Sequence, residues 1–191
     1  MRQDALKSRQ SLLDAAAVVL SREPAASLEA IAAEAGVGRA TLHRHFRNRQ
    51  HLLKVLALDA MTALDRAFLR LLPAGAAAGT ALRVLFEASL PLGPRHHFLS
   101  QQWSVMEDEE VATTYRRQLD DLAGMVEAAR RAGLIAPEVP TRWVVSVLDA
   151  LIYAGWAAVH SGELTVAQAA DLAFRTLMTG VGCSSMQGAA P

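Results

Sequence analysis

The chain of 191 residues is long enough to bury the core of one or two domains, and its formal net charge is zero. Hydrophobic residues make up 52% of the sequence but aromatic residues only 5%, and alanine and leucine are abundant, which favours helices over β-sheets. A single cysteine, Cys183, excludes an intrachain disulfide framework.

The charges are unevenly distributed along the chain. Residues 1–54 carry nine Lys and Arg against five Asp and Glu, a net charge of +4. Residues 55–191 carry ten against fourteen, a net charge of −4. This division predicts a basic N-terminal part and an acidic body with different tasks.

The N-terminal part of the sequence predicts four helices in succession. Apolar residues recur three or four positions apart from Leu6 to Leu20, which is the spacing of an amphipathic helix. Ser27 and Asn48 are residue types that commonly cap helix N-termini, and Gly36 is placed for the left-handed conformation that ends a helix. These signals predict helices over residues 4–21, 28–34, 39–46 and 48–72.

The rest of the chain predicts a second helical part. The segment PAGAAAG, residues 73–79, is the clearest linker in the sequence. Beyond it, apolar periodicity predicts five further helices. Their expected ranges are residues 80–91, 95–104, 107–132, 140–160 and 165–181.

Residues 28–46 combine a short helix, a glycine turn and a second short helix. This is the arrangement of a helix-turn-helix unit, in which the second helix enters the DNA major groove. At about 100° per residue, Leu42 and Phe46 share one face of the second helix and are expected to pack inward. The opposite face carries Ala40, Thr41, His43, Arg44 and Arg47. We interpret this face as a DNA-binding surface; the alternative is a solvated helix in an ordinary bundle.

A family resemblance covers residues 12–53, LLDAAAVVLSREPAASLEAIAAEAGVGRATLHRHFRNRQHLL. Through IAAEAGV, TLHRHF and NRQHLL, this segment resembles the N-terminal DNA-binding domain of TetR-family transcriptional repressors. The resemblance implies an all-α fold with an N-terminal three-helix helix-turn-helix domain and a C-terminal helical ligand-binding and dimerisation domain. We expect the first domain over residues 1–50, the second over 51–182 and a flexible tail over 183–191.

The resemblance also implies which side chains face DNA. Arginine pairs with guanine through two hydrogen bonds, and the methyl groups of Ala and Thr contact the thymine methyl group. The expected base contacts are Arg39, Ala40, Thr41 and Arg44. The expected phosphate contacts are Ser27, His43, His45 and Arg49. For His45, packing within the domain is the alternative.

Three positions depart from the family pattern. His43 stands in place of the usual tyrosine, Arg49 in place of lysine, and Gly38 in place of a Ser or Thr N-cap. Arg49 keeps the positive charge. His43 shortens the reach toward phosphate, and Gly38 removes a hydroxyl contact.

One helix is expected to be apolar almost all round: residues 143–159, WVVSVLDALIYAGWAAV. Such a helix is buried on several faces. We expect it to pack partly in the core and partly against a second subunit, together with residues 165–181, and the resemblance implies the same homodimer. A monomer core helix is one alternative and a membrane span another, although 17 residues containing an Asp are marginal for a span. Two-fold symmetry then predicts a palindromic operator.

Large side chains in the C-terminal helices are candidates to line a ligand pocket, although such residues more often form a core. Asp149 is the charged candidate among them, suited to hold a donor group or a cation of the ligand. The expected pocket residues are Phe86, Trp103, Met106, Met125, Trp143, Asp149, Tyr153 and Trp156.

The sequence contains no glycine-rich phosphate loop and no paired-cysteine metal motif, so we expect no cofactor and no metal. The adjacent His96 and His97 would diverge by about 100° on a helix, which disfavours binding of one ion. An all-helical enzyme or metal-binding bundle that uses these histidines with Glu107 and Asp149 is nevertheless the main alternative.

We expect a ligand-responsive repressor that is not an enzyme. Its expected partners are double-stranded DNA, a second copy of the chain and a small-molecule effector, with no membrane. The N-terminal segment MRQDALKSRQ lacks the apolar core of a secretory signal, so a cytoplasmic location is expected. A DNA-binding protein without an inducer, or an activator, is the further alternative.

Overall fold

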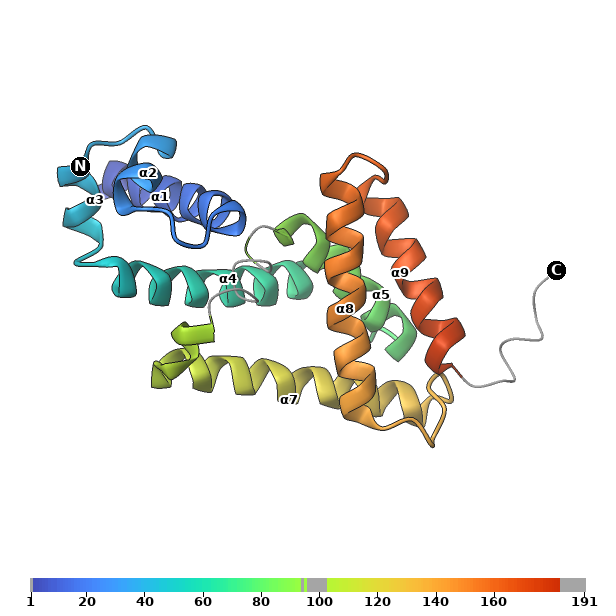
Figure 1. The fold of residues 1–191 in the computed structure, drawn as a ribbon. Coiled ribbons are helices and arrows are strands. Elements are labelled where there is room, and N and C mark those ends of the chain that lie inside the picture. Colours follow the sequence, from blue (N-terminus) through green and yellow to red (C-terminus); the bar gives the residue numbers. More distant parts are fainter. Residues whose placement is uncertain (1, 94, 96–102, 183–191) are drawn as a thin grey trace. The chain divides into compact units, whose positions relative to one another are not determined.

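The computed structural model of this chain is built from α-helices (Figure 1). It describes residues 2–93, 95 and 103–182. No β-strand occurs within these ranges, which confirms the expected all-α fold. The helices are α1 (Arg2–Arg22), α2 (Leu28–Glu34), α3 (Arg39–His45), α4 (Arg49–Leu71), α5 (Ala78–Ser89), α7 (Glu109–Arg131), α8 (Thr141–His160) and α9 (Val166–Val181).

The observed helices agree with the predicted ranges to within a few residues, and the two informative differences have local causes. After α5 the chain tightens into a short 3₁₀ helix, Leu90–Leu92, because Pro91 has no N–H to continue the α-helical bonding. α7 begins only at Glu109, since the Asp108 carboxylate accepts the N–H groups of Glu110 and Val111 at 3.1 and 3.3 Å. The expected helix 95–104 and the tail 183–191 lie mostly or wholly outside the described residues.

Three local signals fix the helix-turn-helix segment. The Ser27 hydroxyl accepts the Ala30 N–H at 3.1 Å and caps α2, and Asn48 Oδ1 accepts the His51 N–H at 2.8 Å at the start of α4. Between α2 and α3, Gly36 has a φ of +65°. A residue with a Cβ rarely adopts this conformation, so glycine is required for the turn.

The chain divides into two compact units. Unit 1 comprises residues 1–63 and 94–114, and unit 2 comprises residues 64–93 and 115–191. This division does not follow the boundary expected after residue 50, because the buried side chains of α4 lie between Leu52 and Met61, within unit 1.

Unit 1 has an apolar core made by α1, α2, α3 and the first part of α4. Its fully buried side chains include Leu12, Leu13, Leu20, Ile31, Leu42, Phe46, Leu52 and Leu56. Ion pairs attach the later segment of the unit to these helices. Arg95 reaches Asp14 of α1 at 2.6 Å and Asp59 of α4 at 3.2 Å, and Lys54 of α4 reaches Asp108 at 3.0 Å.

Unit 2 has a separate core to which α5, α7, α8 and α9 contribute. α9 packs against both α5 and α8, and α8 and α9 lie side by side in Figure 1. The core cluster includes Leu82, Phe86, Val126, Ile135, Val144, Leu148, Ile152 and Leu177. α8 therefore buries one side, with Val144, Leu148, Ile152 and Gly155, rather than its whole circumference.

Candidate nucleic-acid interface and ligand site

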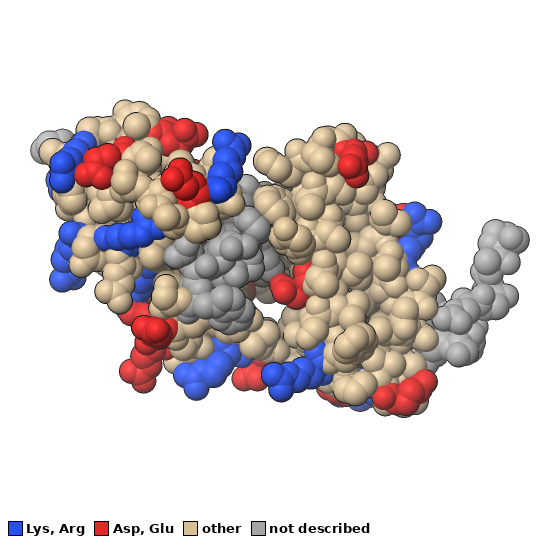
Figure 2. Space-filling view, viewed as in Figure 1, with Lys and Arg blue, Asp and Glu red and all other residues tan. Residues whose placement is uncertain are grey.

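The second helix of the helix-turn-helix unit, α3, separates apolar from basic side chains as the sequence predicted. Leu42 is 1% exposed and Phe46, directly after the helix, is 0% exposed. The exposed side chains are Arg39, Ala40, His43, Arg44 and Arg47, and Thr41 is half-buried. Figure 2 shows Lys and Arg side chains, with carboxylates among them, over the surface that α1, α2 and α3 form. This surface has the charge and the exposed helix face that a duplex requires.

Arg39 does not project alone from this surface. Its Nε lies 3.2 Å from Oε1 of Glu29, in the first turn of α2. The same Nε also points at Nε2 of His43, at 3.5 Å, the outer limit of a hydrogen bond. The base contact predicted for Arg39 is therefore made by a side chain that already has neighbours on α2 and α3.

Arg49 has a structural role beside the predicted phosphate contact. Its guanidinium donates to the carbonyl oxygen of Pro24 at 2.5 Å and to that of Ala26. These bonds attach the start of α4 to the turn between α1 and α2. Each terminal nitrogen of an arginine carries a second N–H, so a phosphate contact by Arg49 stays a prediction.

His45 is packed rather than presented. It is half-buried, its ring centroid lies 6.3 Å from that of Phe46, and its Nε2 has no hydrogen-bond partner in the part of the chain that the structure describes. Burial lowers the pKa of His45, and the nearby charges of Arg44 and Arg9 lower it further. These contacts favour the packing interpretation over the phosphate contact.

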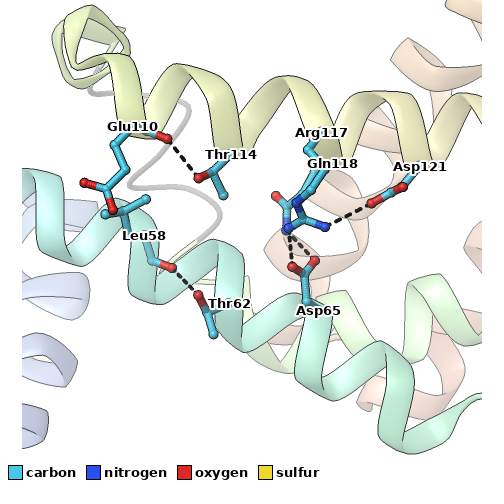
Figure 3. Close-up of polar contacts among 8 residues, drawn as sticks. All are labelled: Leu58, Thr62, Asp65, Glu110, Thr114, Arg117, Gln118 and Asp121. Carbon is cyan, nitrogen blue, oxygen red and sulfur yellow. Dashed lines mark hydrogen bonds and ion pairs between the residues drawn. The ribbon is translucent and has the colours of Figure 1, made fainter.

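The other end of α4 is held by a polar network in unit 2 (Figure 3). Asp65 of α4 accepts hydrogen bonds on both carboxylate oxygens, from Arg117 at 2.5 Å and from Gln118 at 2.6 Å, both on α7. Arg117 also donates to Asp121, one turn further along α7, at 3.0 Å. α4 is thus bonded to unit 1 by Arg49 near its start and to α7 near its end.

The residues predicted to line a ligand pocket do not share one environment. Phe86 is fully buried in the core of unit 2, and Met125 and Trp156 are half-buried against that core. Trp143 and Tyr153 are 62% and 51% exposed, and Asp149 is exposed. Met106 is half-buried in unit 1, and the side chain of Trp103 lies outside the described residues.

A smaller group of these residues does lie together on α8. The Tyr153 and Trp156 rings are 5.7 Å apart, and Trp156 stacks on His160 at 5.5 Å. The backbone of Gly93 lies directly against the Trp156 indole, since a Cβ at Gly93 would be 1.4 Å from the ring.

Tyr115 is the residue that the sequence analysis missed at this place. Burial raises the pKa of its phenol, and the negative charge of Asp149 raises it further, so Asp149 of α8 lies near Tyr115 of α7. No spacing rule links two residues on different helices. Tyr115, Asp149, Tyr153 and Trp156 together make an acidic and aromatic group within unit 2, which we call the α7–α8 aromatic group.

The structure also contains a hollow of about 570 Å³ in unit 1, between the start of α4 and residues 104–108. Its lining is mostly polar and includes Arg47, His51, Lys54 and Asp108. None of the residues expected to line a ligand pocket borders it. Among the described residues no group of three or more His, Cys, Asp or Glu could hold a metal ion, and His96 and His97 lie outside them.

Known proteins share both the sequence and the fold of this chain. Residues 12–56 match the family described as "Bacterial regulatory proteins, tetR family". Over 175 residues, 92% of this chain and 90% of the relative, the sequence is 36% identical to the HTH-type transcriptional repressor LfrR of Mycolicibacterium smegmatis.

Solved structures extend this similarity to three dimensions. LfrR from Mycobacterium smegmatis in complex with proflavine superposes with a TM-score of 0.76 at 33% identity, over 95% of this chain and 98% of that chain. The ketosteroid transcriptional regulator KstR2 of Mycobacterium tuberculosis has the same fold, with a TM-score of 0.74 at 17% identity over 92% of this chain and 95% of that chain. The helix-turn-helix geometry, the sequence match and the shared fold establish that this chain belongs to the TetR family of DNA-binding transcriptional regulators.

Proposed function

We propose that this protein represses transcription by binding a palindromic operator as a homodimer and is released from it by a small-molecule inducer. The observation that carries this proposal is the orientation of α3: Leu42 and Phe46 are buried, whereas the basic side chains from Arg39 to Arg47 are exposed. In this assignment, residues 1–50 bind DNA, residues 51–182 bind the inducer and dimerise, and residues 183–191 form a tail.

The DNA contacts follow from the exposed face of α3. Arg39, Ala40, Thr41 and Arg44 address base edges in the major groove. Ser27, His43 and Arg49 address phosphates, which position the helix without reading sequence. A regulator of this kind acts where the bacterial DNA lies, so we place it in the cytoplasm.

The homodimer is supported by the exposed side of α8. Among the described residues, α8 is the helix whose length and composition would also suit a membrane span, yet only 22% of its most apolar 18 residues are buried within the single chain. Trp143 and Tyr153 on α8 and Leu172 on α9 remain exposed. A second copy would cover these residues with its own α8 and α9, in a four-helix interface with two-fold symmetry.

The inducer class that fits best is a planar aromatic cation. A relative with 33% identity has been solved in complex with proflavine, which is such a cation. In this chain the α7–α8 aromatic group offers the Asp149 carboxylate and the faces of Tyr115, Tyr153 and Trp156. A carboxylate attracts the cation, and aromatic faces stack on a flat ring system.

The proposed mechanism couples the two sites through conformation. The inducer releases the operator only if it binds more tightly to a conformation in which the two α3 helices no longer fit successive major grooves. α4 runs from unit 1 into unit 2, so it is the element that we expect to carry the change. A coupling of about 1–3 kcal/mol corresponds to a roughly 5- to 150-fold loss of operator affinity.

The proposal is tested by footprinting the purified protein on the DNA that flanks its own coding sequence. We expect protection of an imperfect palindrome, and release of that DNA when proflavine is added. Arg44→Ala should relax selectivity at one base pair of each half-site at a cost of about 1–3 kcal/mol. Absence of any protected sequence would refute the DNA-binding part, and undiminished protection at saturating proflavine would refute this inducer class.

A further inference from the structure

A carboxylate stands on the surface that is expected to face DNA. Glu29 lies in the first turn of α2, and its side chain is 52% exposed. A negative charge near the phosphates of DNA weakens binding to any sequence, because it opposes the attraction on which non-specific affinity depends. Its position therefore calls for a compensating gain.

The contact between Glu29 and Arg39 uses only one part of the guanidinium. The carboxylate Oε1 lies 3.2 Å from Nε of Arg39, and the weak contact to His43 also involves Nε. In the part of the chain that the structure describes, no hydrogen bond or ion pair engages Nη1 or Nη2 of Arg39. The two terminal amino groups are thus left available, side by side.

Those two groups are the ones that guanine recognition requires. Guanine presents O6 and N7 in the major groove, and arginine meets them with two parallel N–H groups. An arginine held at Nε by a carboxylate presents its Nη1–Nη2 edge in a defined direction. The ion pair with Glu29 therefore leaves intact the edge of Arg39 that reads a base.

Holding the side chain in advance also lowers the cost of binding. Arg39 is 72% exposed, and an exposed arginine that is not held samples many rotamers which it must give up on DNA. A group that is already oriented before binding loses less conformational freedom. This gain applies only when the base that Arg39 meets is the matching one.

We propose that Glu29 is a specificity-determining residue of this regulator, which positions Arg39 so that its terminal amino groups read one guanine in each operator half-site. The inference rests on the proposed function, since it presupposes that Arg39 contacts a base. Glu29 then has two opposite effects: it weakens binding to DNA in general and strengthens discrimination at one base pair.

The test compares two carboxylates of the same helix. Glu29→Ala removes the partner of Arg39. Glu34→Ala removes the same charge from the exposed last residue of α2 and serves as the matched control. Binding of each full-length variant is measured on the footprinted operator, on operators with single base-pair substitutions and on unrelated DNA, and thermal unfolding checks that each variant is folded. Glu29→Gln is the second variant if Glu29→Ala does not fold.

The base pair read by Arg39 is the one whose substitution no longer affects binding in Arg39→Ala. At that base pair we expect Glu29→Ala to lower the ratio of dissociation constants about two- to fivefold, the range measured for exposed ion pairs. Glu34→Ala should leave this ratio unchanged. Both variants should bind unrelated DNA more tightly than the unaltered protein, because each loses a negative charge.

A double variant separates positioning from a general charge effect. If Glu29 acts through Arg39, Glu29→Ala has no effect on the ratio once Arg39 is alanine. An unchanged ratio in Glu29→Ala, an equal loss in Glu34→Ala, or a loss that persists without Arg39 would each overturn the inference. If the unaltered protein shows no sequence preference, the proposed function itself fails, and this outcome is distinct from the other three.

Discussion

His45 shows how a basic residue on a recognition helix is diverted from DNA by its own surroundings. It lies one residue after the exposed Arg44, yet its ring is half-buried beside Phe46. The neighbouring charge of Arg9 comes from α1, which the sequence of α3 alone does not reveal. Position on the helix therefore does not decide function for a single side chain; the packing around it does.

The lowered pKa of His45 predicts how stability depends on pH. The free histidine has a pKa of 6.5, and burial together with Arg44 and Arg9 lowers it in the folded protein. Between the two values the unfolded chain binds a proton that the folded chain does not, so the free energy of unfolding falls as the pH falls below about 6.5. The contribution of His45 is thus fully present above pH 6.5 and is lost toward the lower, folded value.

This dependence is measured by urea unfolding without DNA at a series of pH values from 7.5 to 5. The unaltered protein should lose more stability over this range than His45→Gln, which cannot bind the proton. His43→Gln, at the exposed position two residues earlier, is the control and should behave like the unaltered protein. Equal losses in the protein and in His45→Gln would show that His45 does not resist protonation.

Arg49 marks the limit of sequence reasoning at single residues. Its charge predicts a phosphate contact, but its guanidinium bonds to the carbonyl groups of Pro24 and Ala26, about 25 residues earlier in the chain. The proximity of Tyr115 and Asp149 is of the same kind, because it depends on how α7 and α8 pack. Such pairs follow from tertiary structure and have no sequence spacing of their own.

At the scale of the element, α3 is predictable because its signals are local. Gly36 fixes the turn, Ser27 caps the preceding helix, and the spacing of Leu42 and Phe46 gives the buried face. The start of α7 is less predictable. Several acids stand side by side there, and only the fold shows that Asp108 is the cap, since its other oxygen pairs with Lys54 at 3.0 Å.

The same local logic predicts the consequence of loosening α3. Leu42 is its only buried residue within the helix and is 1% exposed, so Leu42→Ala should lower the free energy of unfolding by about 2–5 kcal/mol. Operator affinity should fall as well, although no DNA contact is removed. Chemical denaturation and an operator-binding assay measure the two effects.

Ala40→Gly is the control on the exposed face of α3. It should cost only about 1 kcal/mol of stability through helix propensity. If Leu42→Ala were no more destabilising than this, the inward packing of α3 would not be what holds the helix in place.

For the whole molecule, the exposed side of α8 predicts the oligomeric state. Ala154 is exposed on the helix that leaves Trp143 and Tyr153 uncovered. Ala154→Glu places a charge in the proposed two-fold interface, twice per dimer, and should shift the protein toward monomers. Sedimentation equilibrium measures the shift, and operator affinity should fall with it because a monomer occupies only one half-site.

Ala132→Glu adds the same charge in the exposed turn that follows α7 and should leave the dimer intact. Dimerisation that is equally strong in Ala154→Glu would place the interface elsewhere. A monomeric unaltered protein would remove the reason for expecting a palindromic operator.

The response to an inducer is also a property of the whole molecule, since it links the α7–α8 aromatic group in unit 2 to α3 in unit 1. Asp149→Asn keeps the size of the side chain and removes the charge that would attract a cation. We expect this variant to bind the operator as tightly as the unaltered protein and to require at least about tenfold more proflavine for release, because a charge-assisted interaction of about 1.5–3 kcal/mol is lost.

The two measurements distinguish ligand binding from coupling. Proflavine affinity is measured by fluorescence without DNA, and release by operator binding at increasing proflavine concentrations. A parallel weakening of both assigns Asp149 to the ligand site. Normal proflavine affinity with impaired release would instead make Asp149 part of the coupling, since only the difference in affinity between the two conformations shifts the equilibrium. Unchanged affinity and unchanged release would exclude Asp149 from both roles and leave the aromatic side chains alone to recognise the inducer.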